Sequence, residues 1–246
     1  KPVTLRGEGH VQLLPPATPV PNRCTEDEDA GRPLQIGICI HGVLGGPVDS
    51  SGDLPSVITP VRDVHVSGME IDQFDDAIES GGTDGMVISS VSAHGNSGMD
   101  FFYGTGTVLI DLDVTGSSGY ASTSLQRSQG VRVLHSRFTG NGGFGLALTD
   151  TSDAMVVGNE LTGNSGGLAV VDSAGDELAE NLTIVGNLVE DNTGYWPGDG
   201  EAPPVSGIGI ALVGTRDAAV HGNRVIGNTP SADAPLGGFG IGLFDA

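Results

Sequence analysis

The sequence is poor in positive charge, in aromatic residues and in long apolar runs. Its 246 residues contain ten Lys and Arg against 31 Asp and Glu, which gives a formal net charge of −21. This balance disfavours nonspecific binding to nucleic acid or to anionic lipid, because both present negative charge. No apolar run approaches the roughly 18 residues of a membrane span. We therefore expect neither a nucleic-acid partner nor membrane insertion.

Cysteine is also scarce, and the two that occur, Cys24 and Cys39, flank the least repetitive part of the chain. A disulfide between them would stabilise that part by roughly 3 kcal/mol in the loop-entropy model. We expect this bond and, with it, an oxidising compartment and a secreted protein. Two reduced, buried thiols are the alternative. A zinc site is not expected, since no His or further Cys lies at ligand spacing.

The loop between the cysteines is acidic and offers the only candidate for a bound cofactor. Asp27 and Asp29, with Glu26 or Glu28, could hold Ca²⁺ through oxygen ligands. An acidic loop with no fixed turn geometry is more often solvated. Calcium thus stays an alternative, and no other cofactor is predicted.

Glycine, by contrast, is abundant, and a short phrase ending in Asn recurs along the chain. Its clear copies are Thr139–Asn141, Thr162–Asn164, Glu190–Asn192 and Ile226–Asn228, and degenerate copies end at Phe74, Asn96 and Ser117. Successive copies are 22, 21, 24, 23, 28 and 36 residues apart. This period is too short for a helix-pair repeat and fits a coil of about three short strands. The sequence predicts an all-β protein, a single-stranded right-handed parallel β-helix.

The register of the predicted coils follows from three columns. The residue three positions before each copy's end is apolar, with polar neighbours, as in a half-buried strand; these residues are Ile71, Ala93, Val114, Phe138, Leu161, Val189 and Val225. Asn residues form two further columns, whose stacked side-chain amides would hydrogen-bond from coil to coil. A third strand is predicted where Gly, apolar and any residue alternate, beginning at Gly98, Gly143, Gly167, Gly207 and Gly238.

We predict one domain over residues 1–246, with irregular opening coils and a cap at 1–63 and regular coils at 64–246. Loops are inserted at 172–181, 193–206 and 229–237, and the last two leave the same corner. Insertions from one corner of a solenoid usually border its binding groove. Tyr195 and Trp196 lie in such a loop, where Trp196 could stack on a sugar ring or fold back onto the solenoid as an apolar patch.

The coils with Gly-Asn corners, such as Val157-Gly158-Asn159 and Val185-Gly186-Asn187, resemble those of the pectate-lyase-like superfamily of right-handed parallel β-helix proteins. That superfamily includes the repeats shared by carbohydrate-binding proteins and sugar hydrolases. The resemblance covers about Val64 to Ala246. It implies an extracytoplasmic protein that binds or acts on polysaccharide or oligosaccharide. The sequence departs from the family in two respects: the YG-x-DPH motif of mannuronan epimerases and the Lys/Arg pairs of pectate lyases are absent.

Acidic, His and Tyr side chains converge only in the first regular coils. Cross-coil spacing places Asp72 beside His94, and Glu79 beside Asp100 at about the separation of carboxylates in retaining glycosidases. The candidate catalytic residues are Asp72, Asp76, Glu79, His94, Asp100 and Tyr103. In so acidic a chain, a solvated face is the competing interpretation.

The candidate substrate ligands are Tyr195, Trp196 and Arg127. For Arg127, cross-coil ion pairing is the competing interpretation. Two functional hypotheses follow: a secreted polysaccharide lyase or hydrolase, and a noncatalytic module for polysaccharide binding or surface display. The absent basic clamp favours the second, and the grouping of His94, Asp100 and Tyr103 favours the first.

Overall fold

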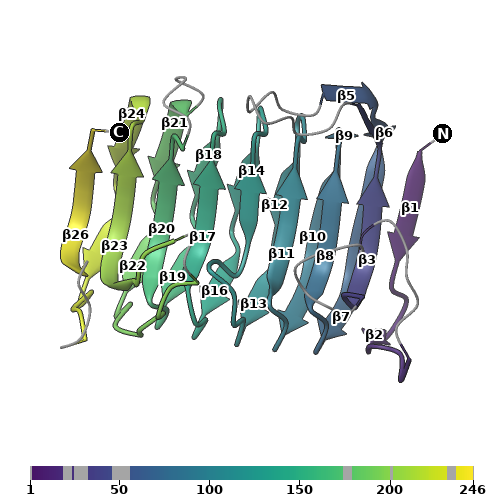
Figure 1. Cartoon of the computed structure of the whole chain (residues 1–246), viewed down its shortest axis with the longest axis horizontal. Coiled ribbons are helices and arrows are strands. Elements are labelled where there is room, and N and C mark those ends of the chain that lie inside the picture. The colour runs from purple at the N-terminus through teal and green to yellow at the C-terminus, as the bar shows by residue number, and fades with distance from the viewer. Residues whose placement is uncertain are drawn as a thin grey trace.

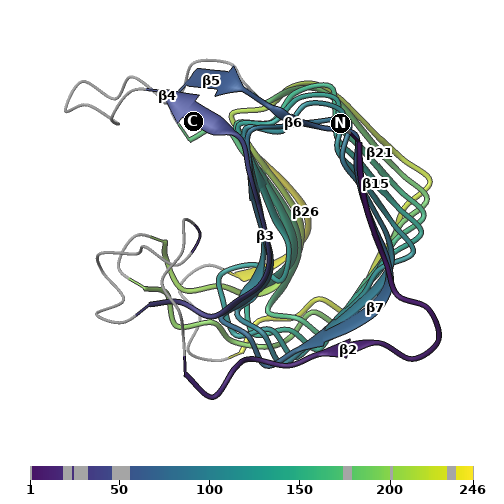
Figure 2. The ribbon, with the colours of Figure 1, turned by 90° about the vertical axis from the view of Figure 1, so that its right-hand side faces the viewer.

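The computed structural model describes residues 2–18, 24, 33–45, 56–173, 179–199, 202–231 and 237–245. In these ranges the regular structure consists of strands, and no helix is long and apolar enough to cross a membrane. Parallel strands stack from the N-terminal to the C-terminal end of the molecule (Figure 1). Viewed along the stack, the coils superpose around one interior (Figure 2). The predicted right-handed β-helix is confirmed.

Each coil has three faces. A 14-stranded sheet forms two of them, here called the first and second wings, which the long strands β7 (Val64–Asp72) and β10 (Val87–His94) join. The first wing also holds β1 (Val3–Arg6), β12 (Val108–Ile110), β15 (Arg132–Leu134), β18 (Met155–Val157), β21 (Glu180–Val185) and β24 (Arg216–His221). The second wing also holds β2 (Gln12–Leu13), β13 (Asp113–Thr115), β16 (Arg137–Thr139), β19 (Glu160–Thr162), β22 (Leu188–Glu190) and β25 (Arg224–Ile226).

An 8-stranded parallel sheet forms the third face. Its strands are β3 (Ile36–His41), β8 (Asp76–Gly81), β11 (Gly98–Phe102), β14 (Ser124–Gln126), β17 (Phe144–Thr149), β20 (Gly166–Val171), β23 (Ser206–Val213) and β26 (Gly237–Phe244). Two small pairs lie outside these sheets: β4 (Val43–Gly45) with β5 (Ser56–Thr59), and β6 (Val61–Arg62) with β9 (Thr83–Asp84).

The inward column predicted from the repeat forms the core. Ile71, Ala93, Val114 and Phe138 are opposite one another on successive strands, and each is at most 1% exposed. Polar residues on either side point outward, because successive side chains of a strand face opposite sides. The period-2 signal therefore identified the correct face of the second wing.

Both predicted Asn columns form hydrogen-bonded ladders. The side-chain amide of Asn164 donates to Asn192 Oδ1 at 2.9 Å and to the Phe138 carbonyl at 3.0 Å. Its own Oδ1 accepts from the backbone N–H and the side-chain amide of Asn141. Asn159 and Asn187 repeat this pattern in the second column. In this way each side-chain amide forms hydrogen bonds with backbone N–H and C=O groups that would otherwise be unpaired at the corner.

The predicted register of the third strand is wrong by two residues in three coils. Leu146 is opposite Leu168, and Leu168 is opposite Ile210. The aligned glycines are therefore Gly145, Gly167, Gly209 and Gly240, rather than Gly143, Gly167, Gly207 and Gly238. An added Cβ at Gly145 or Gly209 would meet backbone or core atoms at 3.2 Å or less. Positions 145 and 209 require Gly because the core packs closely against them. The prediction placed Gly143 and Gly207 there, because each lies two residues earlier in the same alternating pattern.

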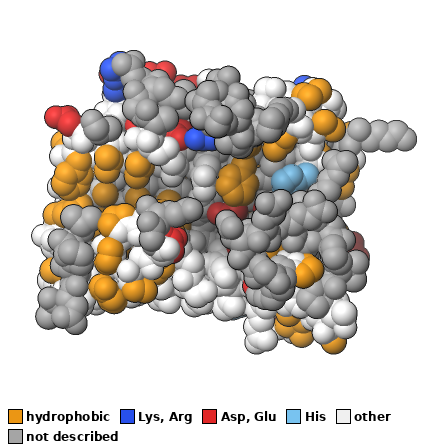
Figure 3. Space-filling model, in the orientation of Figure 1, with side chains coloured by type: hydrophobic (Ala, Val, Ile, Leu, Met, Phe, Trp, Pro, Cys, Tyr) orange, Lys and Arg blue, Asp and Glu red, His pale blue; other side chains and the backbone are white. Residues whose placement is uncertain are grey.

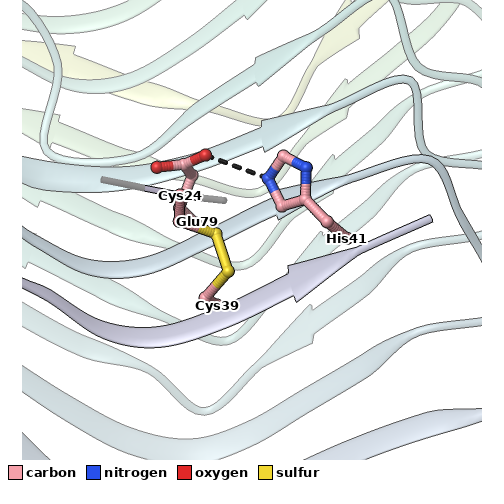
Figure 4. The surroundings of a disulfide bond; sticks show 4 residues. All are labelled: Cys24, Cys39, His41 and Glu79. Atoms are coloured by element: carbon pink, nitrogen blue, oxygen red, sulfur yellow. Dashed lines mark hydrogen bonds and ion pairs between the residues drawn. A yellow bond between two sulfur atoms is a disulfide. The ribbon is translucent and has the colours of Figure 1, made fainter. Parts of the chain in front are cut away.

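Cys24 and Cys39 form the predicted disulfide, with their Cα atoms 5.9 Å apart. Cys39 is on β3, opposite Glu79 of β8 (Figure 4). The bond therefore attaches Cys24 to the outer face of the 8-stranded sheet. The acidic loop considered for calcium lies outside the described residues.

Three insertions leave the corner between the second wing and the 8-stranded sheet. Two were predicted, 193–206 and 229–237, and the third is 118–123, which precedes β14. The backbone N–H of Ser231 donates to Ser206 Oγ at 2.8 Å, so the two predicted loops touch. Described residues of the insertions 118–123 and 193–206 line cavities on the outer face of the 8-stranded sheet. The candidate site lies on that face.

Candidate functional site

The structure divides the six predicted catalytic residues among three places. His94 is opposite Asp72 on the second wing, as predicted, and it is also opposite Thr115. Asp100 is opposite Glu79 on the 8-stranded sheet, also as predicted. The two pairs belong to different sheets, so the structure does not bring them together into one site. Tyr103 lies at the far end of β11, apart from both.

Three carboxyl groups do gather on the 8-stranded sheet: Asp76, Glu79 and Asp100, here called the acid group. A register shift brings Asp76 to them. Gly98 is opposite Asp76, whereas the next residue, Met99, is opposite Ile78, so Ala77 is an extra residue in β8. Such a bulge re-aims a side chain. Asp76 begins β8, and its carboxyl group lies near those of Glu79 and Asp100.

A cavity of about 150 Å³ lies over Asp76 and Asp100. It is here called the acid pocket, and Ser97, Gly98, Gly119, Tyr120, Ala121, Ser124 and Gln126 complete its lining. Gly98 keeps it open, because a Cβ there would lie 3.8 Å from Asp76 Oδ1 and 3.1 Å from the Ala121 carbonyl oxygen. Carboxylates near the middle of this face are visible in Figure 3.

Two members of the acid group, Asp76 and Asp100, have raised pKa values. Burial, followed by the charges of Asp100, Glu79 and Asp75, raises the pKa of Asp76 to about 8. Burial and the charge of Glu79 raise the pKa of Asp100 to about 7, against a hydrogen bond from Ser124 that lowers it. Both effects disfavour the ionised form. At pH 7 Asp76 is therefore mostly protonated, and Asp100 carries its proton about half of the time.

Glu79 is held from the neighbouring coil. Its Oε1 lies 2.9 Å from His41 Nε2, and both side chains are mostly buried (Figure 4). The His41 ring packs over Gly81, where an added Cβ would approach the ring to 2.9 Å. His41 was missed from sequence because its place beside Glu79 depends on the pairing of β3 with β8, which no repeat signal covers.

Next to the acid pocket lies an apolar cavity of about 330 Å³. Tyr120, Phe144, Ala169, Val205, Ile208 and Phe239 are among its lining residues. Tyr120 lines both cavities, and its ring meets Phe144 and Trp196 edge to face at 5.4 and 5.3 Å. Apolar side chains gather over the C-terminal strands of this face (Figure 3).

Trp196 folds back onto the solenoid, the second of the two alternatives for it. It is only 7% exposed, and the backbone of its loop closes through reciprocal 2.9 Å hydrogen bonds with Val205. Tyr195 is 45% exposed. Tyr120 was missed from sequence, although its insertion, 118–123, leaves the same corner as the predicted loops.

Arg127 lies with Tyr103 at the end of the 8-stranded sheet. Its guanidinium donates to Tyr103 Oη at 3.3 Å and to Asp150 Oδ2 at 3.4 Å, and the Asp150 side chain is 1% exposed. The cross-coil pairing considered for Arg127 is therefore present. Tyr103 accepts from this cation rather than facing the acid group.

Two clusters of described residues have the ligand types of a metal site. One contains Cys24, His41 and Glu79, but the Cys24 sulfur is in the disulfide and cannot bind as a thiolate. The other contains Glu70, Asp72 and His94.

The fold defines a class, the right-handed parallel β-helix proteins. The family model for the right-handed β-helix region matches residues 76–246, and the chain belongs to this family. No curated protein matches it in sequence.

Among the solved structures similar to this chain is the A-module of mannuronan C-5 epimerase AlgE6 from Azotobacter vinelandii. The two share 14% sequence identity, the match covers 75% of this chain and 63% of that chain, and the TM-score is 0.46. A single-residue mutant of the periplasmic alginate epimerase AlgG has 14% identity, 86% and 55% coverage, and a TM-score of 0.44. DFA-IIIase from Arthrobacter chlorophenolicus A6, in a structure without its lid, has 17% identity, 86% and 63% coverage, and a TM-score of 0.38. The chain thus spans less than two thirds of each of these structures.

Proposed function

We propose that the protein is an extracytoplasmic β-helix that hydrolyses a neutral saccharide at the acid group. The observation that carries this proposal is the pairing of Asp100 with Glu79 across adjacent strands. Adjacent strands are about 4.8 Å apart, and retaining glycosidases hold their two carboxyl groups about 5–5.5 Å apart. Asp100 supplies the proton, and Glu79 supplies the carboxylate that attacks the sugar carbon.

The proton assignments follow from the raised pKa values. Asp100, with a pKa of about 7, carries a proton over much of the neutral range and gives it to the glycosidic oxygen as that bond breaks. Asp76, with a pKa of about 8, stays protonated and donates a hydrogen bond to a sugar hydroxyl. His41 Nε2 donates to Glu79 and orients its carboxylate. Water then releases the sugar from Glu79, with Asp100 as the base.

Charge selects the substrate class. The acid pocket is lined by two aspartates and, among the described residues, by no Lys or Arg. A uronate would place its own carboxylate against these groups without a counter-charge, and a lyase needs such a uronate. The pocket therefore favours a neutral saccharide and hydrolysis over an acidic one and elimination. Tyr120 offers an aromatic wall on which a sugar ring can pack. The disulfide supports a secreted location.

The test is incubation with neutral and acidic polysaccharides, with detection of new reducing ends and of unsaturated uronate absorbance. We expect reducing ends from neutral substrates only, with a rate that falls as pH rises through about 7. Asp100→Asn should lower the rate at least about 100-fold, whereas the matched variant Asp113→Asn, on the second wing, should leave it unchanged. Unsaturated products, or equal rates for both variants, would contradict the proposal.

A noncatalytic saccharide-binding module is the second candidate, and the apolar cavity beside Tyr120 favours it. At about 330 Å³ it is larger than the acid pocket. Calorimetric titration with the same panel distinguishes the two candidates. Binding without cleavage, unchanged in Asp100→Asn and weakened in Tyr120→Ala, would identify a binding module.

A further inference from the structure

Glu70, Asp72 and His94 form a cluster on the outer face of the second wing that the proposed reaction does not use. Glu70 and Asp72 are two residues apart on β7, so both side chains face outward. His94 of β10 is directly opposite Asp72. One ligating atom from each lies within 4.8 Å of the others. Three potential metal ligands from two coils therefore converge.

Asp72 gives an independent indication that a ligand belongs here. The residue is only 7% exposed. Its Oδ2 accepts a 2.6 Å hydrogen bond from the side-chain amide of Gln12, whereas its Oδ1 is buried and has no hydrogen-bond partner. A buried carboxylate oxygen without a partner is costly, and such oxygens are normally paired or bind a metal. A cation between Asp72, Glu70 and His94 would satisfy it.

His94 is oriented as metal-binding histidines are. Its Nδ1 lies 2.8 Å from Thr115 Oγ1 on the next coil. When Nδ1–H donates to that hydroxyl, Nε2 carries a free lone pair, and this outer contact fixes the tautomer. His10 lies next to the cluster, with its Nε2 3.8 Å from Glu70 Oε2, and its side chain is 80% exposed.

We propose that Glu70, Asp72 and His94 bind one divalent transition-metal ion of the Zn²⁺ type, with His10 as a fourth ligand. Imidazole nitrogen with carboxylate oxygen suits Zn²⁺, whereas Ca²⁺ requires six to eight oxygens. Ligands of tetrahedral zinc are about 3.3–3.5 Å apart, so Glu70 and His94, both half-buried, must close slightly on the ion.

With His10, which precedes β2, as a ligand, the ion would join the first three coils of the solenoid. Glu70 and Asp72 belong to β7 and His94 to β10, while Gln12, opposite Glu70, belongs to β2. Metal binding would therefore stabilise the N-terminal end of the stack, because an ion that binds only the folded chain shifts the equilibrium toward it. The site lies on a different sheet from the acid group, so its test does not depend on catalysis.

The experiment uses untagged, EDTA-stripped protein with the disulfide intact. Calorimetric titration with ZnCl₂ should give one site, CaCl₂ should bind at least about tenfold more weakly, and zinc should raise the melting temperature. Asp72→Asn keeps an oxygen that accepts the Gln12 hydrogen bond but removes the negative charge. Both Asp72→Asn and His94→Gln should abolish the zinc-dependent rise in melting temperature. Thr115→Val should weaken zinc binding about 10–100-fold, the effect of losing an outer contact.

Two matched controls should keep the zinc response. His221→Gln removes an exposed histidine from the first wing, and Asp113→Asn removes another second-wing aspartate with a buried unpaired oxygen. Anomalous scattering from zinc-soaked wild-type crystals should place the ion between Asp72 and His94, a result that needs no variant to fold. No zinc binding, equal affinity for calcium, a zinc shift that survives the double variant Asp72→Asn/His94→Gln, or an ion elsewhere would overturn the proposal.

Discussion

The carboxyl group of Asp76 lies at the start of β8, beside those of Glu79 and Asp100. Its position there depends on one extra residue, Ala77, which turns Asp76 to the outer face. Burial and three negative neighbours then keep its proton bound. At the residue scale, a single bulge therefore converts an ordinary surface aspartate into a member of the acid group.

Asp76 makes the stability of the fold depend on pH. Its pKa is about 8 in the folded chain against 3.8 for the ordinary group, so the unfolded chain loses its proton first as pH rises. The stability present below about pH 4 is therefore lost progressively up to about pH 8. Asp76→Asn, neutral at every pH, should melt higher than the wild type at pH 8.5 and flatten this dependence. About 1 kcal/mol corresponds to roughly 2–4 °C in a domain of this size.

The measurement is the melting temperature between pH 4 and pH 9. Asp217→Asn is the control, because Asp217 is exposed and has a positive φ that Asn tolerates. Parallel curves for wild type and Asp76→Asn would show that Asp76 is not a protonated acid in the folded protein.

At the scale of the elements, corner side chains and one covalent bond fasten the coils. Strands of three residues, such as β13, β16 and β19, make few hydrogen bonds of their own. The Asn ladders at their ends add side-chain hydrogen bonds from coil to coil. Because each amide serves two neighbouring coils, a defect in one rung leaves unpaired groups in both.

Asn164→Leu tests the ladder. Asn164 is fully buried, and leucine would leave the Phe138 carbonyl and the backbone N–H of Asn141 without partners. We expect a loss of about 1–3 kcal/mol in the free energy of unfolding, measured by denaturant titration. Thr139→Ala, two residues before Asn141 and half-buried, should cost little. Equal tolerance of both changes would mean that the ladder does not stabilise the stack.

Reduction tests the disulfide. Cys24 and Cys39 are 15 residues apart, so the loop-entropy model assigns their bond roughly 3 kcal/mol. Nonreduced protein should weigh two hydrogens less than reduced protein in intact-mass analysis, and reduction should lower its melting temperature. A double variant, Cys24→Ser/Cys39→Ser, should melt like the reduced wild type. Two free thiols in the freshly purified protein would contradict the assignment.

At the scale of the whole molecule, charge is the dominant surface property. With a net charge of −21, the folded chain repels itself, and the compact state is destabilised by that repulsion. Opposing this are exposed cross-coil ion pairs such as Arg137 with Glu160 and Arg224 with Glu190. Each is worth under about 1 kcal/mol, so we expect the net repulsion to dominate.

Salt therefore should stabilise the protein. Raising NaCl from about 0.05 to about 0.5 M shortens the screening length well below 10 Å and weakens long-range repulsion more than contact pairs. The expected result is a higher melting temperature at high salt and neutral pH, and a smaller increase near pH 4, where about half of the carboxyl groups are neutral. A melting temperature that falls with salt would show that the ion pairs dominate.

The sequence alone determined the coil. An apolar residue at a fixed place in each repeat determines the inward face. Asn residues two positions before it and three positions after it determine the two ladders. Both patterns depend only on local spacing within one coil. The cross-coil neighbours Asp72 with His94 and Glu79 with Asp100 followed from that register. The disulfide followed from there being only two cysteines.

Tertiary structure decided which neighbours share a face. His94 and Asp100 are six residues apart, yet a corner places them on different sheets, and the bulge at Ala77 brings Asp76 to Glu79 instead. His41 and Tyr120 reach the acid group from the opening coil and from an insertion, where the repeat carries no register. The sequence also led to the wrong alignment of the third strand, because only contact with the core distinguishes Gly145 from Gly143. Spacing along a chain specifies a repeating strand, whereas turns, bulges and insertions are fixed by packing between coils.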